Sequence, residues 1–226
     1  MSYQLRPDLS YCRVDGRLIF LDIRNDRYFR LSDAMERTFT MHLCGSGRPE
    51  ADIGGLIELG LLVESRPNLE PAPSPAIESP SHSALESPPS AEPIRMSPLL
   101  DVFGIVCMTQ VHLKTCSMKW TLSTLAAYRQ RKAPQTEPES GKARERRLSR
   151  TAAAFLRARP YVPIDTCCLI DSISLVRFLA KRGMAANLVF GVTGSPFSAH
   201  CWVQVGPLVL NDTLGNTHAH TPIRVV

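Results

Sequence analysis

The alternation of hydrophobic and polar positions in residues 1–65 predicts three short strands followed by two helices. The segments YCRV, RLIFLDI and RYFRL have the composition of strands, and the dipeptides Asp15-Gly16 and Asn25-Asp26 between them are turns that tolerate a positive φ. A helical pattern starts behind a capping Ser32, and the segment ADIGGLIELGLLVE supplies a second helix. Three antiparallel strands with two helices in so short a stretch predict a winged-helix-like domain.

Residues 66–98 break this pattern. They hold nine of the chain's 18 prolines and few large apolar side chains, so burial of their apolar surface cannot offset the entropy lost in ordering the backbone. We therefore expect a Pro/Ser-rich linker, stiffened by its prolines, between folded domains at residues 1–65 and 99–226.

The pattern after the linker predicts helices followed by an antiparallel sheet. Helical periodicity covers residues 98–118, 120–132, 144–158 and 167–182. We expect Asp165-Thr166 to cap the last of these helices and Gly183 to end it. The segments ANLVFGV, AHCWVQVG and PLVLND read as strands, so the chain as a whole is predicted to be α+β.

The composition indicates a folded protein, because 44% of its 226 residues are hydrophobic. The first residues carry no basic-then-apolar signal pattern. The longest apolar stretch, Leu99–Met108, is interrupted by Asp101 and has about half the length of a membrane span. We expect a cytoplasmic protein with no membrane partner.

The net charge of +5 arises largely from residues 141–159, which are rich in lysine and arginine. Such a segment can bind nucleic acid, anionic lipid or an acidic partner. No helix-turn-helix, RNA-binding or zinc-finger pattern accompanies it, so a solvated helix face is favoured and no nucleic-acid partner is expected.

The seven cysteines form no repeating framework and no CxxC pair, so we expect most of them to be reduced and no zinc site. His218 and His220 near the end of the chain are interpreted as solvated rather than as metal ligands. The glycines at 45–47 lack the lysine of a phosphate loop. We therefore expect no metal and no cofactor.

Three residues far apart in the chain, Cys168, His200 and Asp212, are the candidate catalytic set. Cys168 falls in the first turn of its predicted helix, where unpaired N–H groups and the helix dipole favour a thiolate. An imidazole can take the thiol proton, and a carboxylate can orient the ring and stabilise the imidazolium. The order cysteine, histidine, Asx is that of papain-like and transglutaminase-like folds, whereas a single cysteine taken alone is more often a small buried hydrophobe.

The register of the predicted hairpin tests this set, because side chains alternate between the faces of a strand. A two-residue Gly206-Pro207 turn pairs Val205 with Leu208 and directs Asp212 away from His200. A three-residue connection brings the two side chains to one face. We therefore predict the three-residue connection or an equivalent bulge.

The segment CLIDSISLVRFLAKRGMAANLVFGVTGSPFSAHCWVQVGPLVLND resembles the C-terminal part of lasso-peptide B proteins, transglutaminase-like cysteine proteases that remove the leader from a ribosomally made precursor. The matching blocks are Cys168-Leu169, Ser172, Leu188-Val189-Phe190-Gly191-Val192, Pro196-Phe197, His200, Trp202-Val203 and Asn211-Asp212. Because Cys168 carries the leucine and serine of this pattern, it rather than the adjacent Cys167 is predicted to be the nucleophile.

The segment YQLRPDLSYCRVDGRLIFLDIRNDRYFRLS is similar to the leader-recognition domain of the same family, so the resemblance implies a chain in which the recognition and protease domains are fused. It implies that the leader adds a strand along the third predicted strand, Arg27–Leu31, and that the second predicted helix, Ile53–Leu59, forms the other wall of the site. The implied leader-binding residues are Arg27, Tyr28, Phe29, Arg30, Leu31, Ile53, Leu56 and Ile57.

The resemblance implies a cysteine endopeptidase that frees the α-amine of the core peptide for a separate, asparagine-synthetase-like macrolactam cyclase. The expected partners are therefore the precursor peptide and that cyclase. Two other functions stay open: a transglutaminase-like amidase or acyltransferase that uses the same three residues, and a non-catalytic adaptor that carries the leader to another enzyme. The linker is longer than the family leads us to expect, so its value would be tethering a bound leader near the protease.

Overall fold

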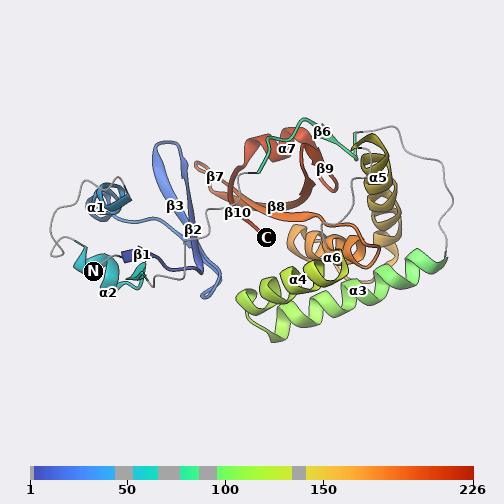
Figure 1. The fold of residues 1–226 in the computed structure, drawn as a ribbon, viewed down its shortest axis with the longest axis horizontal. Helices are drawn as coiled ribbons and strands as arrows, with labels where there is room; N and C mark the ends of the chain where they lie inside the picture. Colours follow the sequence, from blue (N-terminus) through green and yellow to red (C-terminus); the bar gives the residue numbers. More distant parts are fainter. Residues whose placement is uncertain (1–2, 44–52, 66–76, 87–95, 134–140) are drawn as a thin grey trace. The chain divides into compact units, whose positions relative to one another are not determined.

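The computed structural model describes residues 3–43, 53–65, 77–86, 96–133 and 141–226, and the chain divides into two compact units, residues 1–76 and 77–226 (Figure 1).

The first unit contains the predicted three-stranded antiparallel sheet, made of β2 (Leu9–Val14), β3 (Arg17–Asp22) and β4 (Arg27–Phe29) in that order. The turns between these strands place Asp15 and Asp26 at a φ of 50°, as their turn dipeptides predict.

The first helix, α1 (Asp33–Leu43), also agrees with the prediction, and the hydroxyl of Ser32 accepts a hydrogen bond from the backbone N–H of Met35 at 3.4 Å. The second helix is shorter than predicted, because α2 (Gly54–Glu58) stops before Gly60, which adopts a φ of +65°. The residues beyond it form a strand instead.

Strand β5 (Leu62–Glu64) pairs antiparallel with β1 (Tyr3–Leu5), which the sequence did not predict. Phe20 and Phe39 meet edge to face in the core, with their ring centroids 5.1 Å apart. The buried residues of this core are Leu9, Leu18, Phe20, Leu31, Phe39, Leu56, Leu61 and Leu62.

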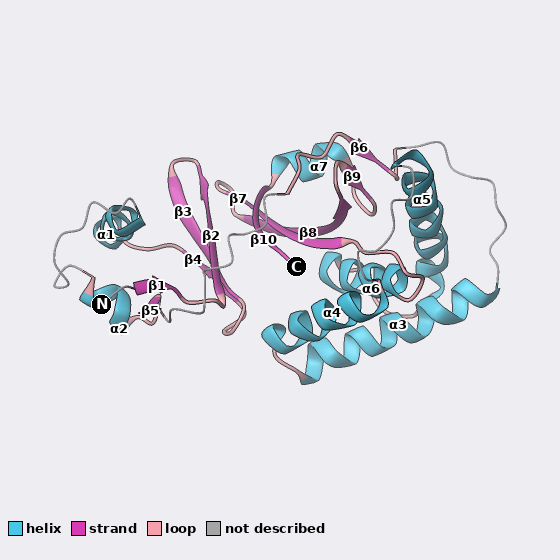
Figure 2. Ribbon diagram, viewed as in Figure 1, coloured by secondary structure: helices cyan, strands magenta, loops and turns pink. Residues whose placement is uncertain are grey.

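The second unit is built on a five-stranded sheet with the order β10-β7-β8-β9-β6. Its strands are β6 (His82–Ser83), β7 (Asn187–Thr193), β8 (Ser198–Val205), β9 (Leu208–Val209) and β10 (Thr221–Val225). Neighbouring strands are antiparallel except β6 and β9, which are parallel (Figure 2).

Helix α6 is the centre of the helical layer of this unit, since it contacts β8 on one side and three other helices around it (Figure 1). The helices are α3 (Met96–Thr115), α4 (Met118–Lys132), α5 (Gly141–Ala158), the short 3₁₀ helix η2 (Arg159–Tyr161), α6 (Cys168–Ala180) and α7 (Leu214–Ala219). Ile173, Leu175 and Phe178 of α6 are completely buried, as expected for a helix enclosed on several sides.

The predicted linker is wrong in its middle part. Residues 77–86 pack on the second unit: Ile77 joins the apolar cluster of Val189, Trp202 and Val209, and His82–Ser83 form β6. Of the other residues of the predicted linker, 66–76 and 87–95 lie outside the described part, and the remaining few begin α3. The structure therefore assigns to the second unit a segment from the middle of the stretch whose overall composition suggested a spacer.

Two further predictions for this unit need correction. The residue before α6 is Cys167, whose side chain makes no capping hydrogen bond, so Asp165-Thr166 do not cap this helix. The interpretation of His218 and His220 as solvated holds for His218, which is exposed, but not for His220, which is buried directly before β10, the strand that pairs with β7.

Helix α3 has the length and apolar composition of a membrane span, and it is the one helix in the described residues that meets both criteria. Only 17% of its most apolar window is buried within the structure, and Leu100 and Val111 are exposed. The cytoplasmic location inferred from the sequence therefore stays a prediction.

Candidate active site

The first member of the candidate catalytic set begins a helix, as predicted. Cys168 is the first residue of α6, and the backbone N–H of Asp171 closes the first turn on the carbonyl of Cys167 at 2.9 Å. Cys168 is half-buried, while Cys167 is exposed. The helix therefore presents the Cys168 sulfur where its charge is partly shielded from water and close to the unpaired N–H groups of the first turn.

The other two members, His200 and Asp212, are in direct contact. His200 lies on β8 opposite Gly191, and its Nε2 is 2.6 Å from Oδ2 of Asp212. Both side chains are largely shielded, with 21% and 12% of their surfaces exposed, so their interaction is screened less than a surface pair.

The predicted three-residue connection is wrong, since the hairpin has the two-residue turn and pairs Val205 with Leu208. Asp212 nevertheless reaches His200, because β9 ends at Val209. The side-chain carbonyl of Asn211 accepts the hydrogen bond of the Val203 N–H at 2.7 Å, and the chain then leaves the path of the strand. The rule that side chains alternate between faces no longer applies to Asp212.

Asn216, which the sequence analysis missed, holds the carboxylate of Asp212. Its Nδ2 donates to Oδ1 and Oδ2 at 3.1 and 2.9 Å, and the backbone N–H of Thr213 donates to Oδ1 at 2.8 Å. Nδ2 also lies 3.1 Å from Nε2 of His200. Because Nε2 donates its own proton to Asp212, it cannot accept a hydrogen bond from the amide of Asn216. The amide hydrogens therefore bond to the carboxylate, and Asn216 orients Asp212 rather than the ring.

The charges of the site favour a thiolate and an imidazolium. Hydrogen bonds from Cys201 and then from His200 lower the pKa of the Cys168 thiol to about 4, although burial alone would raise it. Hydrogen bonds to Asp212 and then to Cys168 raise the pKa of His200 to about 9. Burial raises the pKa of Asp212, but hydrogen bonds from His200 and Asn216 outweigh it and leave that pKa below its usual value. Such a pair, the Cys168 thiolate and the His200 imidazolium, can act as an activated nucleophile beside a charged acid.

Cys201 is a second residue that the sequence analysis did not assign. Its buried thiol hydrogen-bonds to Cys168, and this contact and burial raise its pKa well above the usual value, so Cys201 stays a neutral donor. The hydroxyl of Ser172 donates to the carbonyl of Cys201 at 3.2 Å and accepts from Nδ2 of Asn211 at 2.9 Å. This chain of contacts ties the nucleophile helix to the histidine strand and gives Ser172 a physical role.

Three other residues near the set also have defined places. Trp202, which could have lined a channel, is completely buried and donates from Nε1 to Oε1 of Gln204 at 2.9 Å. His220 is not solvated, because it is buried with its ring centroid 5.3 Å from that of His200. Phe197 is half exposed. The described residues contain no group of three or more His, Cys, Asp or Glu side chains that could hold a metal ion.

The predicted leader-binding residues fall into two groups. Arg27, Tyr28 and Phe29 form β4, whose only strand partner among the described residues is β3, and Phe29 stacks on Phe20 at 5.3 Å. Ile53 and Ile57 pack against the core while keeping part of their surface exposed. Leu31 and Leu56 are 7% and 1% exposed, so their side chains belong to the core.

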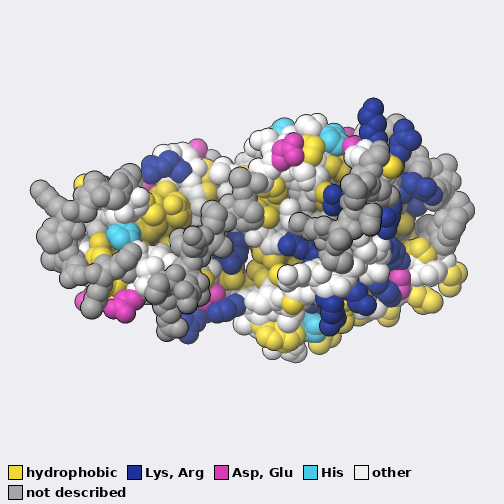
Figure 3. Space-filling view, viewed as in Figure 1, with side chains coloured by type: hydrophobic (Ala, Val, Ile, Leu, Met, Phe, Trp, Pro, Cys, Tyr) yellow, Lys and Arg dark blue, Asp and Glu magenta, His cyan; other side chains and the backbone are white. Residues whose placement is uncertain are grey.

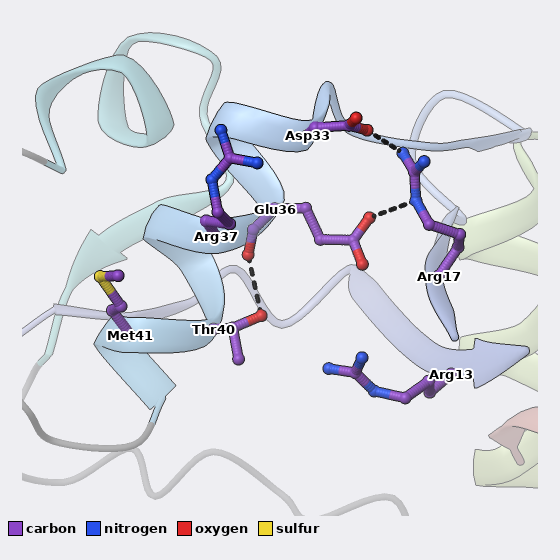
Figure 4. Close-up of a pocket in the computed structure, with 7 residues that line it drawn as sticks. All are labelled: Arg13, Arg17, Asp33, Glu36, Arg37, Thr40 and Met41. Atoms are coloured by element: carbon purple, nitrogen blue, oxygen red, sulfur yellow. Dashed lines mark hydrogen bonds and ion pairs between the residues drawn. The ribbon is translucent and has the colours of Figure 1, made fainter.

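A separate hollow of about 480 Å³ lies in the first unit between α1 and the β2–β3 hairpin (Figure 4). Arg17 points across it to Asp33 and Glu36, with ion-pair distances of 2.7 and 3.1 Å. This hollow contains none of the catalytic or leader-binding residues predicted from the sequence. In the second unit, Lys142, Arg144 and Arg146 of α5 are exposed. Figure 3 shows Lys and Arg side chains on the surface of this unit.

A family model described as the transglutaminase-like superfamily matches residues 112–225, which are 114 of the 226 residues and include all three members of the candidate catalytic set. The chain belongs to this superfamily. Among curated proteins, the microcin J25-processing protein McjB of Escherichia coli is 49% identical over 45 residues, a match that covers 20% of this chain and 22% of that protein. This match supports the resemblance to lasso-peptide B proteins. No solved structure gave a significant match.

Proposed function

We propose that this member of the transglutaminase-like superfamily is a cysteine endopeptidase that removes the leader from a ribosomally made lasso-peptide precursor. The observation that carries the proposal is the convergence of Cys168, His200 and Asp212, with a thiolate favoured at Cys168 and a proton favoured on His200. The similarity to a microcin-processing protein supports the class of substrate.

The proposed reaction follows from the positions of the three side chains. The Cys168 thiolate attacks the carbonyl carbon of the last leader residue, and His200 gives its proton to the departing amine of the core peptide. The leader is then held as a thioester. Neutral His200 next takes a proton from water, hydroxide displaces the thiolate, and the free leader leaves with a new carboxylate. The backbone N–H of Cys168, at the first position of α6, is the natural donor to the developing oxyanion.

The proposed leader site is the edge of β4 together with the exposed parts of Ile53 and Ile57. An extended peptide gains backbone hydrogen bonds when it adds a strand to an open sheet edge. The guanidinium of Arg27 lies 5.3 Å from the ring centre of Phe29, so this edge presents both charge and apolar surface. The freed core would pass to a macrolactam cyclase, which is the second proposed partner.

A mass-spectrometric assay of a candidate precursor tests the proposal. We expect wild type to release leader and core, Cys168→Ala to release neither, and Cys167→Ala to cleave as wild type does. Because Cys167 is adjacent, exposed and of the same residue type, it is a matched control for the loss of a thiol. Cleavage by Cys168→Ala would refute the assignment of the nucleophile.

The same assay addresses the rival functions. Transfer of the leader's acyl group to an added primary amine, without release of free leader, would identify an acyltransferase in place of a peptidase. Leader binding without turnover by wild type would identify an adaptor.

The leader site is tested by substitution in the full-length chain. We expect Tyr28→Ala and Ile57→Ala to raise KM for the precursor while leaving kcat unchanged, and Met41→Ala, an exposed residue of α1, to change neither. If neither substitution on β4 or α2 alters KM, the leader binds elsewhere.

A further inference from the structure

The chain between residues 77 and 86 is attached to the second unit at many points. The backbone N–H groups of Ser81 and Ala84 donate to the carbonyls of Pro207 and Val209 at 2.9 and 2.8 Å, on either side of the parallel β6–β9 pairing. The segment therefore continues the sheet beyond β9.

This segment completes the hydrogen bonding of a buried side chain of the sheet. Gln204 is fully buried, and its Nε2 donates to the carbonyl of Glu78 at 2.6 Å. A buried amide that loses its partner costs more than the hydrogen bond itself contributes, because it is also kept from water. Strand β8, which carries His200, thus has a side chain whose hydrogen bonding depends on residues 77–86.

The same segment holds the loop of Asp212 at two places. The hydroxyl of Ser83, which is 3% exposed, donates to the backbone carbonyl of Asp212 at 2.5 Å. The carboxylate of Glu86 accepts from the backbone N–H of Leu214 at 3.1 Å. These two contacts lie on either side of Thr213, so they fix the backbone directly next to the catalytic carboxylate.

Leu210 and Asn211, at the start of this loop, bond to Val203, and Asp212 and Thr213 lie beyond these contacts. β9 ends at Val209 and α7 starts at Leu214, so the residues between them belong to neither a strand nor a helix. Asn216 orients the carboxylate group but contacts only its side chain. The backbone carbonyl of Asp212 finds its hydrogen-bond donor in Ser83.

We propose that Ser83 and Glu86 are positioning residues of the active site, which hold the Asp212 loop so that its carboxylate faces His200. This inference rests on the proposed peptidase function. It gives the segment that follows the leader-recognition unit in the chain a second role besides joining two domains, because two of its residues position the Asp212 loop. Neither Ser83 nor Glu86 touches the reacting atoms.

The test uses four substitutions in the full-length chain carrying Cys167→Ala, so that only Cys168 is alkylated at this position. Ser83→Ala removes the donor to Asp212, and Glu86→Ala removes the acceptor for Leu214. Glu86→Gln is the conservative variant, because its amide oxygen can still accept that N–H. Ser81→Ala is the matched control, since its exposed hydroxyl hydrogen-bonds to the neighbouring His82 at 2.9 Å and to no other side chain in the described residues of this segment or of the Asp212 loop.

Two measurements are made on each variant: kcat and KM for precursor cleavage, and the pH dependence of Cys168 alkylation by iodoacetamide. We expect Ser83→Ala and Glu86→Ala to lower kcat by about tenfold, with KM unchanged, because misplacement of a catalytic group acts on the chemical step. Their alkylation profiles should move to higher pH as Asp212 supports the imidazolium less well. Glu86→Gln and Ser81→Ala should match the parent protein in both measurements.

The proposal is overturned if Ser83→Ala and Glu86→Ala keep the parent kcat and alkylation profile, or if they change KM alone. If Ser83→Ala does not fold, the two variants of the exposed Glu86 decide the question. A lower kcat in Glu86→Ala together with the parent kcat in Glu86→Gln is specific to the hydrogen bond with Leu214. If the parent protein cleaves no precursor, the peptidase function fails, and the alkylation profile still decides whether the segment positions Asp212.

Discussion

Nε2 of His200 faces Oδ2 of Asp212 at 2.6 Å, which leaves Nδ1 as the nitrogen available to Cys168. A carboxylate on one side of an imidazole and a thiolate on the other stabilise the doubly protonated ring from both sides. The same two contacts raise the pKa of His200 to about 9. The resting site therefore holds opposite charges on Cys168 and His200 over a wide range of pH.

The first prediction concerns this range. The reactive thiolate exists above the pKa of Cys168, about 4, and the charged His200 exists below its pKa, about 9. We expect kcat/KM for precursor cleavage to fall on both sides of that window. In Asp212→Asn the largest cause of the raised His200 pKa is lost, so the alkaline limb should move down toward the ordinary histidine value of 6.5. An alkaline limb that does not move in this variant would separate Asp212 from the titration of His200.

The second prediction concerns Asn216. Asn216→Ala removes the amide that donates to both oxygens of Asp212, so the carboxylate can turn away from His200. We expect kcat to fall by up to about 100-fold with little change in KM. Gly215→Ala on the same helix is the control, since an added Cβ there meets no atom within 4 Å. Equal kcat values for the two variants would show that Asn216 has no positioning role.

The sequence was sufficient to predict the helix that begins near Cys168 and the strand that carries His200, because each depends on a local pattern or on a block of several residues. The catalytic roles of Cys168, His200 and Asp212 stay a prediction. The sequence was insufficient for the Asp212 loop. The direction of the Asp212 side chain depends on where β9 ends. β9 ends where the side chain of Asn211 accepts the hydrogen bond of the Val203 N–H, and the hydrophobic pattern of the sequence does not reveal this tertiary contact.

Strand β6 was missed for a related reason. It lies within residues 66–98, whose overall composition is that of a spacer, whereas residues 77–86 are held by Gln204 and by the edge of β9. The N-cap of α7, by contrast, can be recognised in the sequence. The hydroxyl of Thr213 accepts from the N–H of Asn216, a Thr-x-x-Asn spacing that indicates a helix start and that a search for caps would have found.

The third prediction concerns Gly191, which lies opposite His200 on β7. A Cβ at this position would lie 2.6 Å from Cζ3 of Trp202 and 2.9 Å from Cβ of His220, and both side chains are buried. We expect Gly191→Ala to lower the free energy of unfolding by about 1–3 kcal/mol, as overpacking does. Urea denaturation measures this loss. Gly104→Ala, on a helix with open space around it, should instead raise stability by about 0.4–1 kcal/mol, and a similar result at Gly191 would contradict the close packing.

The fourth prediction concerns Arg159, a 4% exposed residue that supports the chain leading to Cys168. Its guanidinium donates to the carboxylate of Asp171 at 2.5 Å and to the carbonyls of Ile164 and Asp165 at 2.9 and 3.0 Å. Burial is the largest influence on Asp171 and raises its pKa, while Arg159 opposes this effect. Asp171 without Arg159 would be a shielded charge with no cation to compensate it.

Arg159→Met should therefore lower the free energy of unfolding at neutral pH by about 3–5 kcal/mol, the usual cost of breaking a buried ion pair. Arg159→Lys keeps the charge but not the planar fork that bonds two carbonyls and a carboxylate together, so we expect an intermediate loss and slower alkylation of Cys168. The double variant Arg159→Met/Asp171→Asn removes both charges and should recover part of the stability in urea denaturation. Suppose instead that the double variant loses as much stability as Arg159→Met and Asp171→Asn, measured singly, lose together. The two side chains are then not coupled, and the chain before Cys168 is held by the contacts of Arg159 with the two carbonyls alone.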